Sequence, residues 1–381
     1  MSKSSYDVAV VGAGVFGAWT AYQLQRSGRR VVLIDAHGPG NHLSSSGDES
    51  RIIRMGYGAD EVYTRSAVRS LQLWREFSEQ ANEQLVVETG VLWLARADDP
   101  YPTQTLATLR ESGLRFERLT TAEIDRRYPQ IATDGIAWGM LEPDSGVLRA
   151  RRAVQAVVRE AIRLGLEYFQ DQVEPPAAGT FDCLTTKTGK RISAANYVFA
   201  CGPWLPKMFP DLLANRIHPT RQEVFYFSPP DLQYSPPNLP TFIDFGNEAY
   251  GLPSIGNHGV KIAIDRHGEP FDPDNGNRSA TKEGLAEVRR YLARRLPALK
   301  DAPVIDARVC QYENTSNGDF LIDRHPEFES VWLVGGGSGH GFKHGPAVGE
   351  YVAARIAGRV KGIESRFSLA SKRSEQRRAV Y

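Results

Sequence analysis

The chain begins with a glycine pattern that constrains both its fold and what it binds. An apolar run at residues 8–11 leads into Gly12-Ala-Gly14-Val-Phe-Gly17, and a second apolar run ends in Asp35, eighteen residues after Gly17. Gly12 permits a tight turn, Gly14 lets a pyrophosphate approach the backbone, and Gly17 lets a helix and a strand pack closely. The helix N-terminus favours phosphate charge, and Asp35 can accept a hydrogen bond from a ribose hydroxyl. We therefore expect an ADP-containing cofactor, FAD or NAD(P), and the acid disfavours NADP because it would repel a 2′-phosphate.

A second glycine cluster lies near the end of the chain. An apolar strand at 331–334 leads into Gly335-Gly-Gly-Ser-Gly-His-Gly-Phe-Lys-His-Gly-Pro346, and a helix is predicted to continue to about Ile356. A glycine loop followed by a helix N-terminus stabilises negative charge. A reduced flavin carries such charge near N1 and the C2 carbonyl, whereas a nicotinamide needs no second site of this kind. The alternative is a glycine-rich turn that only lets the last helix pack.

The intervening pattern predicts a mixed α/β fold in two interleaved domains. Helical periodicity covers 60–82, 150–164 and 281–296, and strands are predicted at 167–173 and 196–199. Residues 84–96 are typical of a strand pair that turns near Gly90, and 219–265 of an antiparallel sheet. We expect a Rossmann-like FAD-binding domain from residues 1–85, 145–215 and 315–381. A mostly antiparallel substrate domain would use 86–144 and 216–314.

Composition narrows the class of protein. The 381 residues carry a formal net charge of +1, with 41% hydrophobic and 24% charged residues, so neither nucleic acid nor a membrane surface is favoured as a partner. Three cysteines are too few for a disulfide framework or a zinc site, and we expect no metal. No apolar run approaches the ~20 residues of a membrane span, and no signal peptide is apparent. A cytoplasmic protein is expected.

Four cations stand in or near loops at the depth of the expected cofactor: Arg51, Arg54, Lys261 and Lys343. Arg51 and Arg54 are three residues apart, so they would share a face on a helical turn. An arginine fork can grip a carboxylate. The alternative for each cation is an ordinary solvated charge.

Several motifs in the same order resemble the glycine/sarcosine oxidase branch of the D-amino-acid-oxidase-type flavoenzymes. This branch contains monomeric sarcosine oxidases and N-methyltryptophan oxidases, with fructosyl-amino-acid and pipecolate oxidases as cousins. The resemblance covers nearly the whole chain. Its motifs are Val10-Val-Gly-Ala-Gly-Val-Phe-Gly17, Arg51-Ile-Ile-Arg54, Ala200-Cys-Gly-Pro-Trp204, Tyr250-Gly-Leu-Pro253, Val260-Lys261, Val309-Cys-Gln-Tyr312, Phe320-Leu-Ile-Asp-Arg-His-Pro326 and Ser338-Gly-His-Gly-Phe-Lys343.

The resemblance implies FAD, held covalently as an 8α-thioether by Cys310. Without the resemblance, Cys310 would be interpreted as a small buried hydrophobe. Histidines 325, 340 and 344 could touch the flavin or merely pack, and the resemblance favours only His340 as part of the cofactor loop. The expected cofactor-binding residues are Gly12, Gly14, Val15, Phe16, Gly17, Asp35, Ala36, Arg51, Val173, Gly202, Trp204, Cys310, Gly339, His340, Gly341, Phe342 and Lys343.

The resemblance also implies the substrate side. Arg54 and Lys343 match a pair that holds the substrate carboxylate, Lys261 matches the lysine where oxygen reacts, and Tyr250 and Tyr312 match cavity-lining aromatics. The implied activity is an FAD-dependent oxidase of secondary amino acids. A hydride passes from the substrate carbon to flavin N5, the imine hydrolyses, and O2 becomes hydrogen peroxide. We expect a monomer whose partners are a small amine and O2.

Two departures separate this chain from the sarcosine enzymes. They carry a histidine shortly before the Arg-x-x-Arg run, whereas residues 44–50 around Gly47 contain none, and Asp265 stands where they have another histidine. Both predict a different, larger or more polar amine substituent. Asp265 either meets a polar or cationic group of the substrate or is a surface acid. Three alternatives are a flavin-dependent amine dehydrogenase that reduces a quinone or a protein, a non-catalytic flavin-binding protein, and a nicotinamide dehydrogenase.

Overall fold

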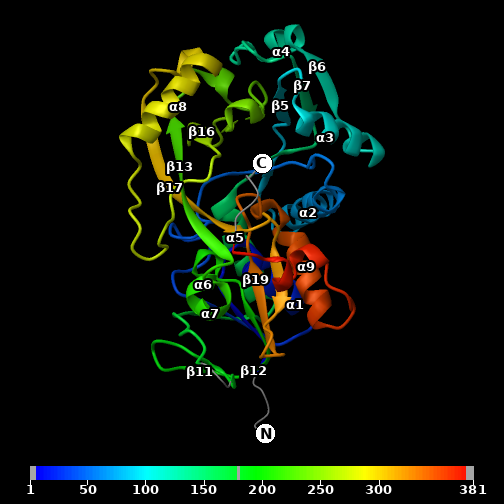
Figure 1. Cartoon of the computed structure of the whole chain (residues 1–381), viewed down its shortest axis with the longest axis vertical. Coiled ribbons are helices and arrows are strands. Elements are labelled where there is room, and N and C mark those ends of the chain that lie inside the picture. Colours follow the sequence, from blue (N-terminus) through cyan, green and yellow to red (C-terminus); the bar gives the residue numbers. More distant parts are fainter. Residues whose placement is uncertain (1–5, 178–180, 375–381) are drawn as a thin grey trace.

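The computed structural model describes residues 6–177 and 181–374, and its first layer is a six-stranded sheet (Figure 1). Neighbouring strands of this sheet are parallel, except that β18 runs antiparallel to β19. The strand order is β18 (Leu321–Arg324), β19 (Val331–Gly335), β12 (Ala194–Phe199), β1 (Tyr6–Val11), β2 (Val31–Asp35) and β9 (Glu167–Gln170).

The inner strands of this sheet are buried on both faces, which explains why β1, β2 and β19 contain continuous apolar runs. Val8 and Val10 of β1 belong to a core shared with helices, whereas Ala9 and Val11 belong to a second core on the opposite face. The helices of the first core are α1 (Val15–Arg26), α2 (Glu61–Gln80), α5 (Ala150–Arg163) and α9 (Gly345–Ile356). The short helices α6 (Leu205–Met208) and α7 (Pro210–Leu213) cover the other face.

The second layer is an eight-stranded sheet in the upper half of Figure 1. Its neighbours are antiparallel, except for the parallel pair of β14 and β5. Helix α8 (Lys282–Arg295) packs Val288 and Leu292 into the core of this sheet. The strand order is β17 (Val304–Thr315), β13 (Ile217–Phe227), β16 (Val260–Ile264), β15 (Ala249–Leu252), β14 (Thr241–Asp244), β5 (Val91–Ala95), β7 (Trp138–Glu142) and β6 (Glu117–Thr120).

Smaller elements complete the fold. Strands β3 (Arg51–Ile53), β8 (Gly146–Leu148) and β4 (Val86–Val87) form a three-stranded sheet, and β10 (Leu184–Thr185) pairs with β11 (Arg191–Ile192). The remaining helices are α3 (Pro100–Glu111) and α4 (Thr121–Arg127). Short 3-10 helices occupy Gly202–Trp204, Leu232–Tyr234, Phe245–Asn247, Pro297–Leu299, Phe342–His344, Ser365–Phe367 and Leu369–Ser371. No helix in the described ranges is long and apolar enough to cross a membrane.

Two local predictions are wrong. The strands on either side of Gly90 do not pair with each other, because β4 joins the three-stranded sheet and β5 the eight-stranded one. Gly90 does turn the chain, with φ of +69°, but the turn leads from the three-stranded sheet to the eight-stranded one. Arg51 begins strand β3, which pairs with β8, so Arg51 and Arg54 do not share a face of a helical turn.

The mixed α/β fold class and the predicted helices at 60–82, 150–164 and 281–296 are confirmed. Thr281 caps the last of these, where its side chain accepts from the backbone N–H of Gly284. The division into two domains stays a prediction. The ends of its pieces, residues 1–5 and 375–381, and the internal residues 178–180 lie outside the described residues.

Candidate active site

The first glycine loop crosses the backbone of a neighbouring strand. Gly12 follows β1 with φ of +102°, and a Cβ there would lie 2.3 Å from the carbonyl oxygen of Ala200. A Cβ on Gly17 would lie 1.9 Å from the carbonyl oxygen of Gly12, so the start of α1 packs against the loop itself. Gly14 caps α1, and the hydroxyl of Ser46 accepts from the N–H of Val15 at 3.1 Å. The loop therefore needs glycine at two positions for steric reasons.

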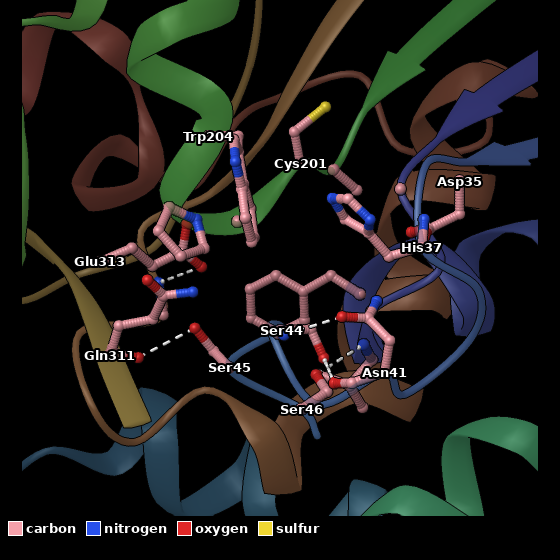
Figure 2. Close-up of a pocket in the computed structure, with 18 of the residues that line it drawn as sticks. Asp35, His37, Asn41, Ser44, Ser45, Ser46, Cys201, Trp204, Gln311 and Glu313 are labelled. Atoms are coloured by element: carbon pink, nitrogen blue, oxygen red, sulfur yellow. Dashed lines mark hydrogen bonds between the residues drawn. The ribbon is translucent and has the colours of Figure 1, made fainter. Parts of the chain in front are cut away.

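A large cavity opens beside this loop at the carboxyl ends of β1, β2 and β12. It encloses about 480 Å³, and Figure 2 shows side chains from separate segments around it. Of the expected cofactor-binding residues, Gly17, His340 and Lys343 do not line it. Those that do are Gly12, Gly14, Val15, Phe16, Asp35, Ala36, Arg51, Val173, Gly202, Trp204, Cys310, Gly339, Gly341 and Phe342.

Asp35 lines the cavity and also fixes the loops around it. One carboxylate oxygen accepts from the N–H of Ala13 at 2.7 Å, and the other accepts from His37 and Gly38, both at 2.8 Å. A carboxylate has about four acceptor sites, so these three bonds leave capacity for a ligand hydroxyl. The side chain thus has a structural role that the glycine pattern does not reveal.

A second cavity of about 80 Å³ adjoins the first, and five residues line both: Arg51, Cys310, Tyr312, Gly339 and Phe342. Every residue predicted for the substrate side lines this smaller cavity, namely Arg54, Tyr250, Lys261, Tyr312 and Lys343, and so does His340. These residues come from β15, β16, β17, the segment after β3 and the loop before α9. The two sheets therefore meet at the smaller cavity.

Arg54 and Lys343 are buried cations in this cavity, with 4% and 5% of their surface exposed. The Arg54 guanidinium lies over the rings of Tyr57 at 4.4 Å and Trp93 at 5.1 Å and donates to the carbonyl of Gly56. The Lys343 ammonium donates to the Tyr57 hydroxyl at 2.8 Å and to the His340 carbonyl at 2.9 Å. Burial and the charge of Arg54 hold the pKa of Lys343 well below its usual value. A ligand anion would relieve this repulsion.

A buried glutamate that the sequence analysis missed supports this pair. The carboxylate of Glu142 accepts from the N–H of Met55 at 2.7 Å, from the Trp93 indole at 2.8 Å and from the Ser145 hydroxyl at 2.8 Å. These bonds fix the segment that carries Arg54. Burial by itself lowers the pKa of Arg54. The nearby Tyr101, Tyr57 and Glu142 raise it by more than burial lowers it, so the pKa of Arg54 lies above its usual value.

Lys261 forms a buried charge cluster with Asp48, which was also missed. The Lys261 ammonium lies 2.5 Å from an Asp48 oxygen and donates to the Ser50 carbonyl at 3.0 Å. Arg51 contacts the same oxygen at 2.5 Å, and the Tyr226 hydroxyl donates to the other at 2.5 Å. Although burial disfavours its charge, Lys261 and Arg51 hold the pKa of Asp48 far below its usual range. Lys261 is therefore a paired cation in this structure.

Cys310 lies on β17 at the border of the two cavities. Its sulfur accepts from the Arg51 guanidinium at 3.1 Å, and the residue is only partly buried. Next to it, Tyr312 donates its hydroxyl proton to Asp265 at 2.6 Å. Asp265 lines the smaller cavity, so the interpretation of Asp265 as a surface acid is wrong. Burial raises the pKa of Asp265 to about 6.

The three histidines differ in their surroundings. His340 lines the smaller cavity, while His344 is fully buried and bonds the Tyr57 hydroxyl at 2.7 Å and the Ser66 hydroxyl at 2.9 Å. His325 stacks on Phe328 at 4.5 Å and lines neither cavity. His325 and His344 thus have packing roles.

Glu313 is another residue that the sequence analysis missed. It lines the large cavity with 8% of its surface exposed, and one carboxylate oxygen accepts from the N–H of Gly337 at 3.1 Å (Figure 2). The other oxygen is buried with no hydrogen-bond partner. Burial raises the pKa of Glu313 to about 7. No motif marks Glu313, because its surroundings come from the distant glycine cluster.

Comparison with known proteins places the chain in a family. The model of the family described as FAD dependent oxidoreductase matches residues 7–355. The chain is 31% identical over 376 residues to monomeric sarcosine oxidase of Bacillus sp. (strain NS-129), covering 96% of this chain and 97% of the relative. It is 30% identical over 355 residues to N-methyl-L-tryptophan oxidase of Salmonella arizonae, covering 91% of this chain and 94% of the relative.

Solved structures share the fold. L-proline dehydrogenase from P. horikoshii superposes with a TM-score of 0.85 at 22% identity, over 96% of this chain and 97% of that one. Fructosamine oxidase (Amadoriase II) from Aspergillus fumigatus gives a TM-score of 0.83 at 23% identity, over 99% and 92%. The sequence relatives and the structural neighbours both match this chain over nearly its whole length. The chain therefore belongs to the family of FAD dependent oxidoreductases, and its cofactor is FAD.

Proposed function

We propose that the protein is an FAD-dependent oxidase of secondary (N-alkyl) amino acids. The observation that carries this proposal is the pair of buried cations, Arg54 and Lys343, in a small cavity that shares a wall with the cofactor cavity. Two cations at this depth favour a ligand carboxylate. Relatives named monomeric sarcosine oxidase and N-methyl-L-tryptophan oxidase support an N-alkyl amino acid as substrate.

The residues present fit FAD. Gly12 and Gly14 line the large cavity without side chains, so a pyrophosphate can approach the backbone there, and Asp35 keeps acceptor capacity for a ribose hydroxyl. The loop at Gly339 and Gly341 would face the pyrimidine end of the flavin, where negative charge develops. When bound, FAD supplies the acceptor for the hydride of the substrate C–H bond and passes the electrons to O2, which yields hydrogen peroxide. The protein's residues bind and orient the amino acid so that this bond meets the cofactor.

Covalent attachment through Cys310 is part of the proposal, supported by the position of its sulfur between the cavities. Cys310→Ser removes the nucleophile and is expected to leave flavin that separates from the chain on acid denaturation, whereas the wild-type protein keeps it. Cys201→Ser is the matched control, because Cys201 lines the same large cavity. Release of flavin from the wild-type protein would refute the attachment.

One observation favours a second candidate, an FAD-dependent dehydrogenase that passes electrons to a quinone or a protein. A lysine charge near the cofactor would stabilise the superoxide that forms when O2 accepts an electron. Lys261 is paired with Asp48, so the positive field that Lys261 offers to O2 is weaker. Hydrogen peroxide formed during turnover in air supports the oxidase. Turnover that requires an added quinone, with no peroxide, supports the dehydrogenase.

The experiment that tests the proposal is anaerobic mixing of the purified yellow protein with sarcosine, N-methyltryptophan, pipecolate, proline, glycine and a fructosyl amino acid, one at a time. Bleaching of the flavin absorbance by an N-alkyl amino acid is the expected result. If no compound bleaches a protein that carries flavin, the proposed substrate class is wrong and a non-catalytic flavin-binding role gains support. Elution as a single chain in size-exclusion chromatography checks the proposed monomer.

A further inference from the structure

Asp265 shares the smaller cavity with Arg54 and Lys343. It follows strand β16 directly. The lining, within the described residues, contains one other carboxylate, Glu223, which is engaged elsewhere. Glu223 pairs with Arg221 and accepts from the N–H and the hydroxyl of Thr281 at 2.7 and 2.9 Å. Asp265 is thus the acid that faces a ligand in this cavity.

The charged side chains of the smaller cavity indicate which charges a bound ligand would carry. Arg54 and Lys343 supply positive charge and Asp265 supplies negative charge around the same 80 Å³ space, while Arg51 and Lys261 share the carboxylate of Asp48. A ligand that fits this space touches most of its walls. If its carboxylate is held by Arg54 and Lys343, the atoms next to that carboxylate therefore lie close to Asp265. A simple carboxylate would bring a second negative charge close to Asp265 and no positive charge to offset it. An amino acid zwitterion satisfies both ends.

We propose that Asp265 receives the ammonium group of a zwitterionic amino acid and takes its proton, so that the amine becomes neutral inside the cavity. This inference rests on the proposed function, because it names the charge state in which the substrate enters. It also assigns a proton acceptor for which the sequence motifs offer no candidate.

The step balances without another reactant. One N–H bond of the ammonium breaks, its proton forms an O–H bond on the Asp265 carboxylate, and the nitrogen keeps the electron pair. The carbon beside the neutral amine could then give up a hydride to FAD, the acceptor that the proposed function supplies, and an iminium ion would remain. Arg54 and Lys343 favour the transfer, since a further positive charge beside them is costly and lowers the pKa of the ammonium.

The groups around Asp265 determine the pH at which its carboxyl group ionises. Burial raises its pKa to about 6, while the hydrogen bond from Tyr312 and the charges of Arg54 and Lys343 oppose this rise, and exposed Glu248 adds to it. The other titratable or charged groups that line the cavity are Arg51, Glu223, Tyr250, Lys261, Cys310 and His340. Asp265 is therefore ionised at neutral pH and is a stronger base than an ordinary aspartate.

A pair of ligands of matching shape tests the charge preference without turnover. 2-Aminoisobutyrate and pivalate differ by an ammonium in place of a methyl group, and neither has a hydrogen on the carbon beside the carboxylate. Titration of each into the flavin-loaded protein is followed by the change in cofactor absorbance. At pH 7.5 the wild-type protein should bind 2-aminoisobutyrate about tenfold more tightly than pivalate. The preference should fade as the pH falls below about 6.

Three variants complete the binding test. Asp265→Asn should lose both the preference and its pH dependence. Tyr312→Phe keeps the carboxylate but removes a hydrogen bond to its charged form, so the transition should move to higher pH. Glu248→Gln, at an exposed position, should keep the preference. An Asp265→Asn variant that still prefers the ammonium ligand, or a wild-type protein that prefers pivalate, would overturn the inference.

Anaerobic flavin reduction by the amino acid that bleaches the wild-type protein tests the proton transfer. In Asp265→Asn the rate should rise about tenfold per pH unit between pH 7 and 9, because only the neutral amine in solution then reacts. A pH-independent rate equal to that of the wild type contradicts the inference while leaving the proposed function intact. The opposite outcome is also distinguishable: the protein prefers 2-aminoisobutyrate to pivalate, but no amino acid bleaches its flavin. That result supports Asp265 as the ammonium site and contradicts the proposed function.

Discussion

At the residue scale, the unusual feature is the number of ionisable side chains buried around the two cavities. Asp48, Arg54, Lys261, Glu313 and Lys343 are all less than a tenth exposed. Most of them have a hydrogen-bonded partner of opposite charge or a carbonyl acceptor, as buried charges require. Glu313 differs, because one of its oxygens is buried without a partner. It is therefore a residue whose ionisation opposes folding.

Replacing Glu313 with Gln should stabilise the protein at alkaline pH. Burial raises the pKa of Glu313 from 4.5 to about 7, so the folded state favours its protonated form. The stability this gives is complete below about pH 4.5 and is lost as the pH rises through 7, at a cost of up to about 3 kcal/mol. Thermal unfolding should show Glu313→Gln more stable than wild type at pH 8 and similar to it at pH 5. The exposed Glu269→Gln should show no such trend, and a pH-independent difference for Glu313→Gln would contradict this explanation.

At the element scale, a buried ion pair joins helix α8 to the eight-stranded sheet. The Arg295 guanidinium at the end of α8 contacts the Asp244 carboxylate of β14 at 2.9 Å, and each side chain is 1% exposed. Arg295 also donates to the carbonyl of Ala132, and the Tyr291 hydroxyl donates to Asp244 at 3.4 Å. The pair fixes the position of the helix over its sheet, because the guanidinium has acceptors from two separate segments.

Removing Asp244 should therefore destabilise the protein strongly. Asp244→Ala leaves the Arg295 charge buried without its acid, which costs about 3–5 kcal/mol. Urea unfolding measures the loss, and the double variant Asp244→Leu, Arg295→Met should recover most of it, because neither charge remains. Asp301→Ala, at an exposed acid 3.9 Å from Lys300, serves as control and should cost less than about 1 kcal/mol. A loss for Asp244→Ala as small as that of the control would refute the structural role of the pair.

At the scale of the whole molecule, the candidate site forms where the two large sheets meet. Lys261 comes from β16 of the eight-stranded sheet, and its partner Asp48 comes from the loop that follows β2 of the six-stranded sheet. Cys310 and Tyr312 reach the same place from β17. The relative position of the sheets, as Figure 1 shows, therefore determines the charges around the cofactor.

Lys261→Met tests whether this charge serves the reaction with O2. The variant keeps the length of the side chain and removes its charge, and should slow reoxidation of the reduced flavin by about 100-fold. Reduction by the substrate should change far less, because Arg54 and Lys343 remain. Stopped-flow absorbance measures the two half-reactions separately, with the exposed Lys282→Met as control. Equal slowing of both half-reactions would exclude the proposed role of Lys261.

The sequence by itself determined the elements whose causes are local. Gly12 and Gly17 predict the turn between the first strand and helix, because only glycine fits the crossing there, and apolar periodicity predicts α2, α5 and α8. Motif resemblance also identified the residues that meet in the smaller cavity. Tertiary structure alone decided the sheets that β4 and β5 join, the strand at Arg51, the burial of Asp48 and Glu313, and the place of Asp265 in the smaller cavity. The physical reason is that strand partners, desolvation and polar contacts depend on segments as far as 259 residues apart, which no local pattern encodes.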